Sequence, residues 1–272
     1  MIKACLIVTT YNRPDALDRV LDSIAKLSLP AQEVVIADDG STDETREVVL
    51  RWQRSLPLSH VWQPDVGFRA AEARNRAVLA SCSEYLIFLD GDCLVFPDFV
   101  ERHLMLAESG RMVVGNRVLL SERLTKEILS GQEYPVDWDV ESWKAARRAG
   151  DINRMMPLSR IGGRYWRLLR SRRWKGVHTC NLGLWRSDFE LVNGFDESYQ
   201  GWGHEDADLA IRLMRKGVFR KDGQFAAPVL HLWHQENSRG NEMENKRRLQ
   251  AVINGQRPIS AECGLSQHGS AP

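Results

Sequence analysis

The chain has 272 residues, a formal net charge of +1, and 43% hydrophobic and 27% charged residues. This composition is ordinary for a globular protein and excludes a largely disordered chain. No apolar run approaches the ~18 residues of a membrane-spanning helix, and the apolar run at the N-terminus is too short for a signal peptide. The five cysteines are scattered without a Cys-x-x-Cys pair, which indicates free thiols in a reducing cytoplasm.

Predicted strands and helices alternate over the first 120 residues. Apolar runs predict strands at residues 2–9, 33–39, 58–62, 84–90 and 111–120. Helices are predicted to begin at Pro14 and Pro97, to follow the turn at 40–42, and to cover residues 70–80. Strands and helices at this spacing predict βαβ units, and therefore an α/β fold with a mostly parallel sheet flanked by helices.

Three of these predicted strands end in polar residues. The endings are Tyr11-Asn12, Asp38-Asp39 and Asp90-Gly91-Asp92. In an open α/β sheet, ligands bind beyond the carboxyl ends of the strands. We therefore expect the three polar endings to line one edge of the sheet and to form a binding site there.

The pattern changes between residues 121 and 175, where strand signals vanish and a helical insertion is predicted. From Trp143 to Lys175 the chain carries eleven Lys and Arg residues and one acidic residue, so this segment has a net charge of +10 and the remainder −9. Such asymmetry favours an anionic partner. Strand and helix signals return at 177–185, 205–217 and 226–234, which predicts a single domain over residues 1–260 and a polar, unstructured tail at 261–272.

Paired carboxylates follow two of the strands. Asp90-Gly91-Asp92 offers two hard oxygen ligands that suit Mg²⁺ or Mn²⁺, and its glycine lets the backbone approach a ligand closely. A turn that closes the strand explains the motif about as well. In "ADDGSTDE" (37–44), the carboxylates either belong to a turn and a capped helix or meet a donor such as a nucleobase N–H or a ribose hydroxyl.

An acidic cluster opens the helix predicted at 205–217. Glu205, Asp206 and Asp208 follow a loop in which Trp202 stands between two glycines. Acidic residues in a first turn complement the helix dipole. This explains Asp208 but not the aromatic residue and two glycines before the cluster.

Two histidines, His231 and His234, lie three residues apart near the end of the last predicted strand. A single histidine has a structural role more often than it binds a ligand. Strand alternation points the two side chains to opposite faces. We therefore expect at most one of them to reach the active edge of the sheet, and His234, nearer the strand end, is the candidate.

Several of these segments resemble a known family. "IVTTYNRPDALDRVLDSI", "VVIADDGSTDET", "GFRAAEARNRAVLAS" and "YLIFLDGDCLVFPDF" resemble the family 2 glycosyltransferases of GT-A fold, a Rossmann-like sheet flanked by helices. "NGFDESYQGWGHEDADLAIRLMRKG" is similar to the C-terminal motif of β-1,4-galactosyltransferases, polypeptide GalNAc-transferases and chondroitin polymerases, and "WHQEN" to a histidine segment of the last. The resemblance covers residues 2–120 and 177–250, leaving the insertion outside it.

This resemblance implies inverting, metal-dependent transfer of a hexose or N-acetylhexosamine from a UDP-sugar. The acceptor would be a hydroxyl of a cell-surface glycan or lipid-linked molecule, as in lipopolysaccharide or capsule assembly. Residues 1–120 would bind the nucleotide, and residues 176–260 would supply the acceptor and catalytic part. The implied nucleotide-sugar-binding residues are Thr9, Tyr11, Arg13, Asp39, Arg74, Asp90 and Trp202.

The resemblance also assigns the catalytic and metal-binding roles. Asp206 would be the general base, with Glu205 beside it shaping the pocket. Mn²⁺ or Mg²⁺ would be held by Asp92 and His234, with Asp90 touching the ribose or a metal-bound water. The helix dipole lowers the pKa of Asp206 while the charge of Glu205 raises it, so the sequence leaves the net direction open. The related motif often has glycine where this chain has His204.

The basic segment at 143–175 allows three interpretations. A solvated helical face, a nucleic-acid site and a contact with an anionic membrane surface all suit interleaved basic and aromatic residues. No nucleic-acid fold motif is present, so we expect no nucleic-acid partner. A cytoplasmic enzyme attached peripherally to the inner face of the membrane is the favoured interpretation.

Two other functions fit parts of the pattern. A nucleotidyltransferase would also use paired carboxylates and a metal on an α/β sheet, although the glycine-rich signature with a following lysine is missing near the N-terminus. A catalytically inactive carbohydrate-binding protein is the non-enzymatic alternative. The presence of Asp92, Asp206 and His234 argues against the latter.

Overall fold

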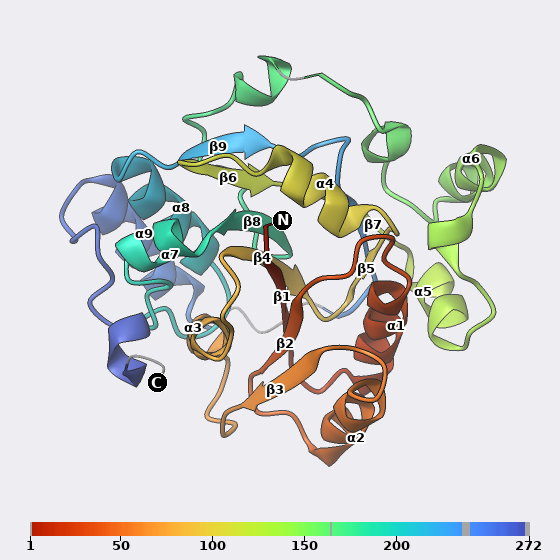
Figure 1. Cartoon of the computed structure of the whole chain (residues 1–272), viewed down its shortest axis with the longest axis horizontal. Coiled ribbons are helices and arrows are strands. Elements are labelled where there is room, and N and C mark those ends of the chain that lie inside the picture. The colour runs from red at the N-terminus through yellow and green to blue at the C-terminus, as the bar shows by residue number, and fades with distance from the viewer. Residues whose placement is uncertain (1, 164, 236–239, 270–272) are drawn as a thin grey trace.

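A computed structural model describes residues 2–163, 165–235 and 240–269. Its centre is a seven-stranded sheet, shown in Figure 1, in the order β3-β2-β1-β4-β8-β6-β9. The strands are β1 (Ala4–Thr10), β2 (Glu33–Asp38), β3 (Leu58–Trp62), β4 (Tyr85–Asp90), β6 (Arg111–Val114), β8 (Asn181–Trp185) and β9 (Phe219–Asp222). Only β8 among them runs antiparallel to its neighbours, which confirms the predicted mostly parallel sheet.

Both faces of this sheet are buried, because alternate residues of each strand point to opposite sides. In β1, Leu6 and Val8 belong to one core cluster, and Cys5 and Ile7 belong to the other. The first cluster includes residues of α1 (Pro14–Ala25), α2 (Asp43–Trp52), α4 (Phe99–Leu106) and α5 (Glu122–Leu129). The second includes residues of α3 (Ala70–Leu79), α7 (Arg186–Leu191) and α8 (Glu205–Arg215).

A second, three-stranded sheet has the order β5-β10-β7, with β5 (Cys93–Val95), β7 (Asn116–Leu119) and β10 (Pro228–His231). The single strand predicted at 111–120 is therefore wrong, because the chain changes sheets at Gly115. A Cβ on Gly115 would lie 2.2 Å from the side chain of Asn181. The chain can make this crossing only where a residue has no side chain.

The segment between residues 121 and 175 contains α5, α6 (Val140–Ala149) and three short 3₁₀ helices, η1 (Pro135–Asp137), η2 (Met156–Ser159) and η3 (Tyr165–Leu168). In Figure 1, α5 and α6 extend to the right of the sheets, while the chain beyond them returns over the edge formed by β9. Strand β9 and η3 pack together. No helix in the described part of the chain is both long and apolar enough to span a bilayer.

The predicted unstructured tail is wrong for its described part, residues 261–269. After α9 (Glu242–Ile253), Ala261 and Leu265 are buried, and η4 (Leu265–His268) contacts α3. Asn193 fixes this end of the chain by accepting a hydrogen bond from the Ser266 backbone N–H and donating one to the carbonyl of Ala261. Two apolar side chains in a mostly polar stretch were enough to anchor it.

Candidate active site

A cavity of about 1170 Å³ opens beyond the carboxyl ends of β1, β2 and β4, where the polar strand endings were expected to meet. Its lining includes every site residue predicted from the sequence: Thr9, Tyr11, Arg13, Asp39, Arg74, Asp90, Asp92, Trp202, Glu205, Asp206 and His234. Pockets for small molecules and cofactors commonly measure about 300–1,000 Å³, so this cavity is larger than most of them. The loop after β4 turns tightly at Gly91, where a Cβ would lie 2.9 Å from the carbonyl oxygen of Thr9.

Three side chains in the cavity could hold a metal ion. Ligand atoms of Asp92, His231 and His234 all lie within 4.8 Å of one another, and no other such group occurs among the described residues. Nε2 of His231 is 3.6 Å from Asp92 Oδ1, and Nε2 of His234 is 3.4 Å from Asp92 Oδ2. The expectation that only one histidine reaches the site is therefore wrong.

Strand pairing explains why both histidines reach Asp92. Strand β10 ends at His231, which pairs with Cys93 of β5, and the Leu232 N–H donates to the carbonyl oxygen of Asp92 at 2.9 Å. Alternation stops where the strand stops, so the chain after His231 is free to turn His234 towards the same carboxylate. Glu236 and Asn237 of the "WHQEN" segment lie outside the described residues.

The donor atoms fit a divalent cation. One carboxylate and two imidazoles provide a hard oxygen and two nitrogens, a donor set that divalent transition-metal ions accept. Asp90 does not belong to this group. Its Oδ1 instead accepts a hydrogen bond from Arg74 Nη2 at 3.3 Å.

Arg74 connects the two halves of the cavity. From α3 its buried guanidinium donates to Thr9 Oγ1 at 3.0 Å and to Glu205 Oε1 at 3.2 Å, besides Asp90. Arg74 Nη1 also lies 4.0 Å from Asp206 Oδ1. One cation thus compensates three carboxylates from two elements, which would otherwise repel each other at short range. It also fixes α8 against the end of β4.

The two carboxylates at the start of α8 have different environments. Burial raises the pKa of Glu205 to about 7, the Asp206 charge adds to the rise, and Arg74 opposes it. Burial also raises the pKa of Asp206, but His178, Arg74 and Thr179 more than offset this and leave it below its usual value. Asp206 is therefore ionised at neutral pH, whereas Glu205 keeps its proton to a higher pH than an ordinary glutamate does.

Thr179 orients Asp206. Its hydroxyl donates to Asp206 Oδ1 at 2.8 Å and its backbone N–H donates to Oδ2 at 3.2 Å, so both carboxylate oxygens are held. Nδ1 of His178 lies 3.8 Å from Oδ2. That distance is too long for a direct hydrogen bond, so His178 lies beside Asp206 without bonding to it.

The raised pKa of Glu205 predicts a pH-dependent stability. Between its ordinary value of 4.5 and about 7, the folded state binds more protons at this site than the unfolded state. The free energy of unfolding should therefore fall as pH rises through this window. In urea unfolding, Glu205→Gln should gain stability relative to wild type from about pH 5 to about pH 8. Glu141→Gln, at an exposed residue, is the control. A flat Glu205→Gln difference would contradict the raised pKa.

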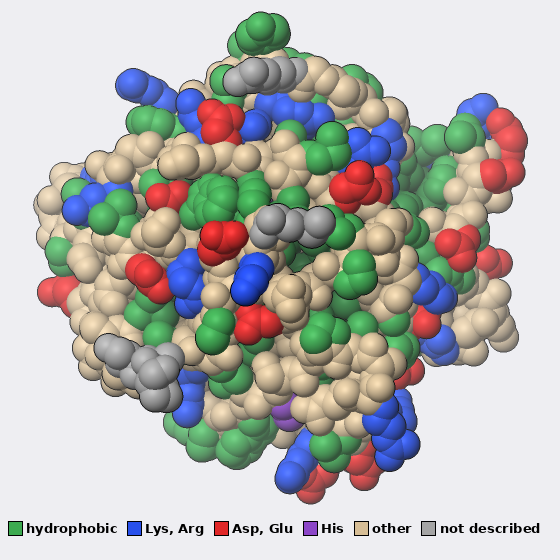
Figure 2. Space-filling model, in the orientation of Figure 1, with side chains coloured by type: hydrophobic (Ala, Val, Ile, Leu, Met, Phe, Trp, Pro, Cys, Tyr) green, Lys and Arg blue, Asp and Glu red, His purple; other side chains and the backbone are tan. Residues whose placement is uncertain are grey.

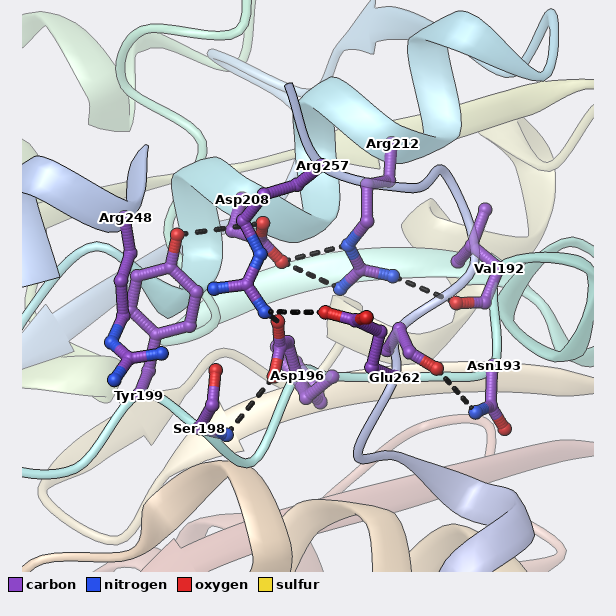
Figure 3. Close-up of polar contacts among 12 residues, drawn as sticks. Val192, Asn193, Asp196, Ser198, Tyr199, Asp208, Arg212, Arg248, Arg257 and Glu262 are labelled. Carbon is purple, nitrogen blue, oxygen red and sulfur yellow. Dashed lines mark hydrogen bonds and ion pairs between the residues drawn. The ribbon is translucent and has the colours of Figure 1, made fainter. Parts of the chain in front are cut away.

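Buried charged residues on the inner face of α8 fix the helix to the rest of the protein. Asp208 accepts a hydrogen bond from Arg212 Nε at 2.7 Å, and Arg212 donates to the carbonyls of Val192 and Gly194. Figure 3 shows this network, with Arg257 bridging Asp196 and Glu262 beside it. Asp208 faces this network rather than the cavity, and Asp206 faces the cavity.

Removing one partner of the Asp208–Arg212 pair should be costly, because both side chains are at most 1% exposed. We expect Asp208→Ala to lower the free energy of unfolding by about 3–5 kcal/mol, since it leaves a buried guanidinium without its counter-charge. Urea denaturation measures this. Glu141→Ala removes an acidic partner of an exposed pair and should change stability by less than about 1 kcal/mol. Equal losses of stability in the two variants would show that the buried pair does not stabilise the fold more than the exposed pair does.

The start of α8 also has an unusual backbone. His204 has a φ of 79°, in the left-handed region where glycine is favoured. The family motif that this stretch resembles often has glycine at this position. His204 therefore keeps the backbone conformation that glycine adopts easily, and adds an imidazole to the cavity lining.

The part of the cavity wall formed by the ends of β1 and β2 contains Asp39, Thr9 and Tyr11. Asp39 is buried and accepts hydrogen bonds from the Gln63 amide and the Arg69 backbone N–H, both at 2.7 Å. Burial raises its pKa. The hydroxyl of the half-exposed Tyr11 donates to Asp65 at 2.9 Å.

Sequence reasoning missed His231, Thr179 and His178. The three-residue strand β5 is too short to give a periodic signal, so nothing indicated that His231 would face Asp92. Thr179 and His178 lie in the loop before β8, within a stretch predicted as strand at 177–185. The polar residues before "NLGLW" were the available signal.

Comparison with known proteins identifies the family of the chain. The model of the family "Glycosyl transferase family 2" matches residues 5–166, and that of "N-terminal domain of galactosyltransferase" matches residues 168–232. Validoxylamine A glucosyltransferase of Streptomyces hygroscopicus subsp. jinggangensis is 34% identical over 224 residues, 78% of this chain and 51% of that protein. Chondroitin synthase of Escherichia coli is 26% identical over 262 residues, 89% of this chain and 36% of that protein.

Solved structures share the fold. A mannosyltransferase from Pyrobaculum calidifontis aligns with a TM-score of 0.58 at 20% identity, covering 92% of this chain and 62% of that one. TarS of S. aureus aligns with a TM-score of 0.63 at 17% identity, covering 98% and 41%. The chain spans about half the length, or less, of the curated relatives named here. With its fold, its cavity and the family model in agreement, the chain belongs to glycosyl transferase family 2.

Proposed function

We propose that this chain transfers a hexose or N-acetylhexosamine, with inversion, from a UDP-sugar to a hydroxyl group of an acceptor. One observation carries the proposal. The Asp92–His231–His234 group and the ionised Asp206 face the same cavity. A cation at the former and a proton acceptor at the latter are the two functions that glycosyl transfer from a nucleotide diphosphate needs.

The ligands of the fold neighbours support the donor and the metal. The mannosyltransferase structure is a complex with GDP-Man and Mn²⁺, and TarS structures contain UDP-GlcNAc or UDP. In this chain we assign Mn²⁺, ahead of Mg²⁺, to Asp92, His231 and His234, because two of the three ligands are imidazoles. A bound divalent cation would neutralise charge that develops on the leaving diphosphate.

The chain's own residues would do the rest. Asp206 takes the proton of the acceptor hydroxyl, and Thr179 keeps its carboxylate oriented for this step. Arg74 holds Asp90 where a ribose hydroxyl could donate to it, and Asp39 receives the base. Trp202, 39% exposed on the cavity wall, offers its indole to the apolar face of a sugar.

We place the acceptor among cell-surface glycans and lipid-linked sugars of lipopolysaccharide or capsule assembly, and the enzyme in the cytoplasm. The chondroitin synthase relatives support a glycan acceptor. A nucleotidyltransferase would instead bind a nucleoside triphosphate and release pyrophosphate. A sugar-binding protein would bind without turnover.

A panel of nucleotide sugars tests this proposal. UDP-glucose, UDP-galactose, their N-acetylhexosamine counterparts and GDP-mannose are each incubated with the protein and Mn²⁺, and released nucleoside diphosphate is measured. We expect UDP release from at least one UDP-sugar and none after chelation. Pyrophosphate release from UTP with a sugar phosphate would favour the nucleotidyltransferase, and binding without turnover would favour the inactive protein.

A further inference from the structure

Two apolar side chains project into solvent beside the edge strand β9. Tyr165 is 86% and Leu169 83% exposed, on and just after η3, which packs against β9. Isolated exposed apolar side chains are common. These two, however, lie in the segment with the densest positive charge of the sequence, and Arg172 and Arg173 follow within four residues.

The cations around this edge outnumber its carboxylates. Three acidic side chains are each shared by two basic ones: Asp98 by Arg102 and Arg160, Glu108 by Arg111 and Lys221, and Asp222 by Arg170 and Arg220. Within the described ranges, Arg172 and Arg173 form no ion pair, and both are exposed. The guanidinium of Arg172 lies 5.6 Å from the ring centroid of Phe219 on β9, which places it at this edge. The edge therefore keeps a net positive charge.

Not every arginine of the segment is available to a partner. Arg167 is buried and donates to the carbonyls of Ile161, Gly163, Asp222 and Gln224. It fixes the loop to the end of β9, so the exposed side chains are presented by an anchored structure. In Figure 2, Lys and Arg side chains gather along the upper edge of the molecule, with hydrophobic side chains projecting beyond them.

We infer that Tyr165, Leu169, Arg172 and Arg173 form a docking surface for an anionic phospholipid membrane. Cations near an anionic leaflet are attracted to it, and exposed apolar side chains enter the boundary between headgroups and acyl chains. This combination complements both layers of a membrane surface. The membrane contact expected for the basic segment at 143–175 is thereby restricted to its last part, residues 165–173.

The chain runs directly from this surface to the cavity wall. Only four residues separate Leu169 from Trp174, and Trp174, Lys175 and His178 line the cavity wall. A membrane bound at the docking surface would therefore lie beside the part of the cavity where Asp206 acts. Binding to vesicles does not depend on the proposed transfer reaction, so each can fail without the other.

A nucleic acid is the less suitable occupant. Its backbone would satisfy the arginines, and its bases could stack on Tyr165. It offers nothing to the exposed aliphatic side chain of Leu169. Substitution of the apolar pair therefore distinguishes a membrane from a nucleic acid in an experiment.

Vesicle flotation tests the docking surface. The full chain is mixed with vesicles of phosphatidylcholine alone or of phosphatidylcholine with phosphatidylglycerol, and floated protein is quantified. We expect binding to the anionic vesicles only. Arg172→Glu with Arg173→Glu should lower the partition coefficient by about tenfold or more, and Tyr165→Ser with Leu169→Ser should also lower it.

The matched control is Arg147→Glu with Arg148→Glu. It makes the same change in net charge on two exposed residues of α6, which Figure 1 shows away from η3, and should float like wild type. Thermal melts confirm that each variant is folded. Unchanged flotation of the Arg172/Arg173 variant, or no binding of wild type to anionic vesicles, overturns the inference. The inference is also overturned if the protein does not bind vesicles but binds RNA, and if the Tyr165/Leu169 variant binds RNA as tightly as the wild type does.

Discussion

Replacement of Asp206 by asparagine is expected to lower kcat by about 10²–10⁴-fold and to leave UDP affinity unchanged. Asparagine keeps the size of the side chain but cannot accept a proton, and loss of a general base costs this much. Thr179 holds the Asp206 carboxylate by two hydrogen bonds, and Asp206 is not one of the three residues that could hold the metal. Steady-state kinetics with the best donor of the panel measures kcat, and calorimetry measures UDP affinity.

Asp43→Asn provides the control for this substitution. Asp43 also lies in the first turn of a helix, α2, but is exposed and outside the cavity lining. It should keep full activity. Near-full turnover of Asp206→Asn would remove Asp206 from the role of base and transfer that role to Glu205, whose pKa is about 7.

Asp92→Ala should abolish Mn²⁺ binding, because Asp92 is the carboxylate between the two histidines. Loss of residues that merely support metal ligands lowers affinity 10- to 100-fold, so loss of a ligand should cost at least about 100-fold. Electron paramagnetic resonance of free Mn²⁺ in a titration measures the affinity directly. His231→Ala should also weaken Mn²⁺ binding. This result would distinguish the two-histidine site of the structure from the one-histidine site expected from the sequence.

Asp15→Ala is the matched change for Asp92→Ala. Asp15 also lines the cavity, but its side chain is 52% exposed and pairs with Arg13. Its removal should leave Mn²⁺ affinity within about twofold. If Asp92→Ala binds Mn²⁺ as tightly as Asp15→Ala does, the metal site lies elsewhere.

The fold and most of the site were accessible from the sequence because both follow from strands that end in polar residues. Parallel strands share one carboxyl edge, so Thr9, Asp39 and Asp90 had to converge once the βαβ pattern was recognised. The acidic cluster before an amphipathic helix identified Glu205 and Asp206. Local pattern and topology were sufficient there.

The remaining features depend on contacts between distant residues. Strand β5 exists because it pairs with β10, more than 130 residues later, and that pairing brings His231 to Asp92. The lowering of the Asp206 pKa depends on Arg74 and on the loop at 178–179. No local sequence pattern places these residues beside Asp206. The packing of residues 261–269 likewise depends on a hydrophobic surface formed by other elements.

The central claim is that a cation held by Asp92, His231 and His234 binds the diphosphate of the donor. Calorimetric titration of UDP into the wild-type protein, with Mn²⁺ and again after chelation, tests it most directly. We expect UDP affinity to be at least about tenfold higher with Mn²⁺, and this difference to vanish in Asp92→Ala. Equal UDP affinity with and without Mn²⁺ would contradict the account.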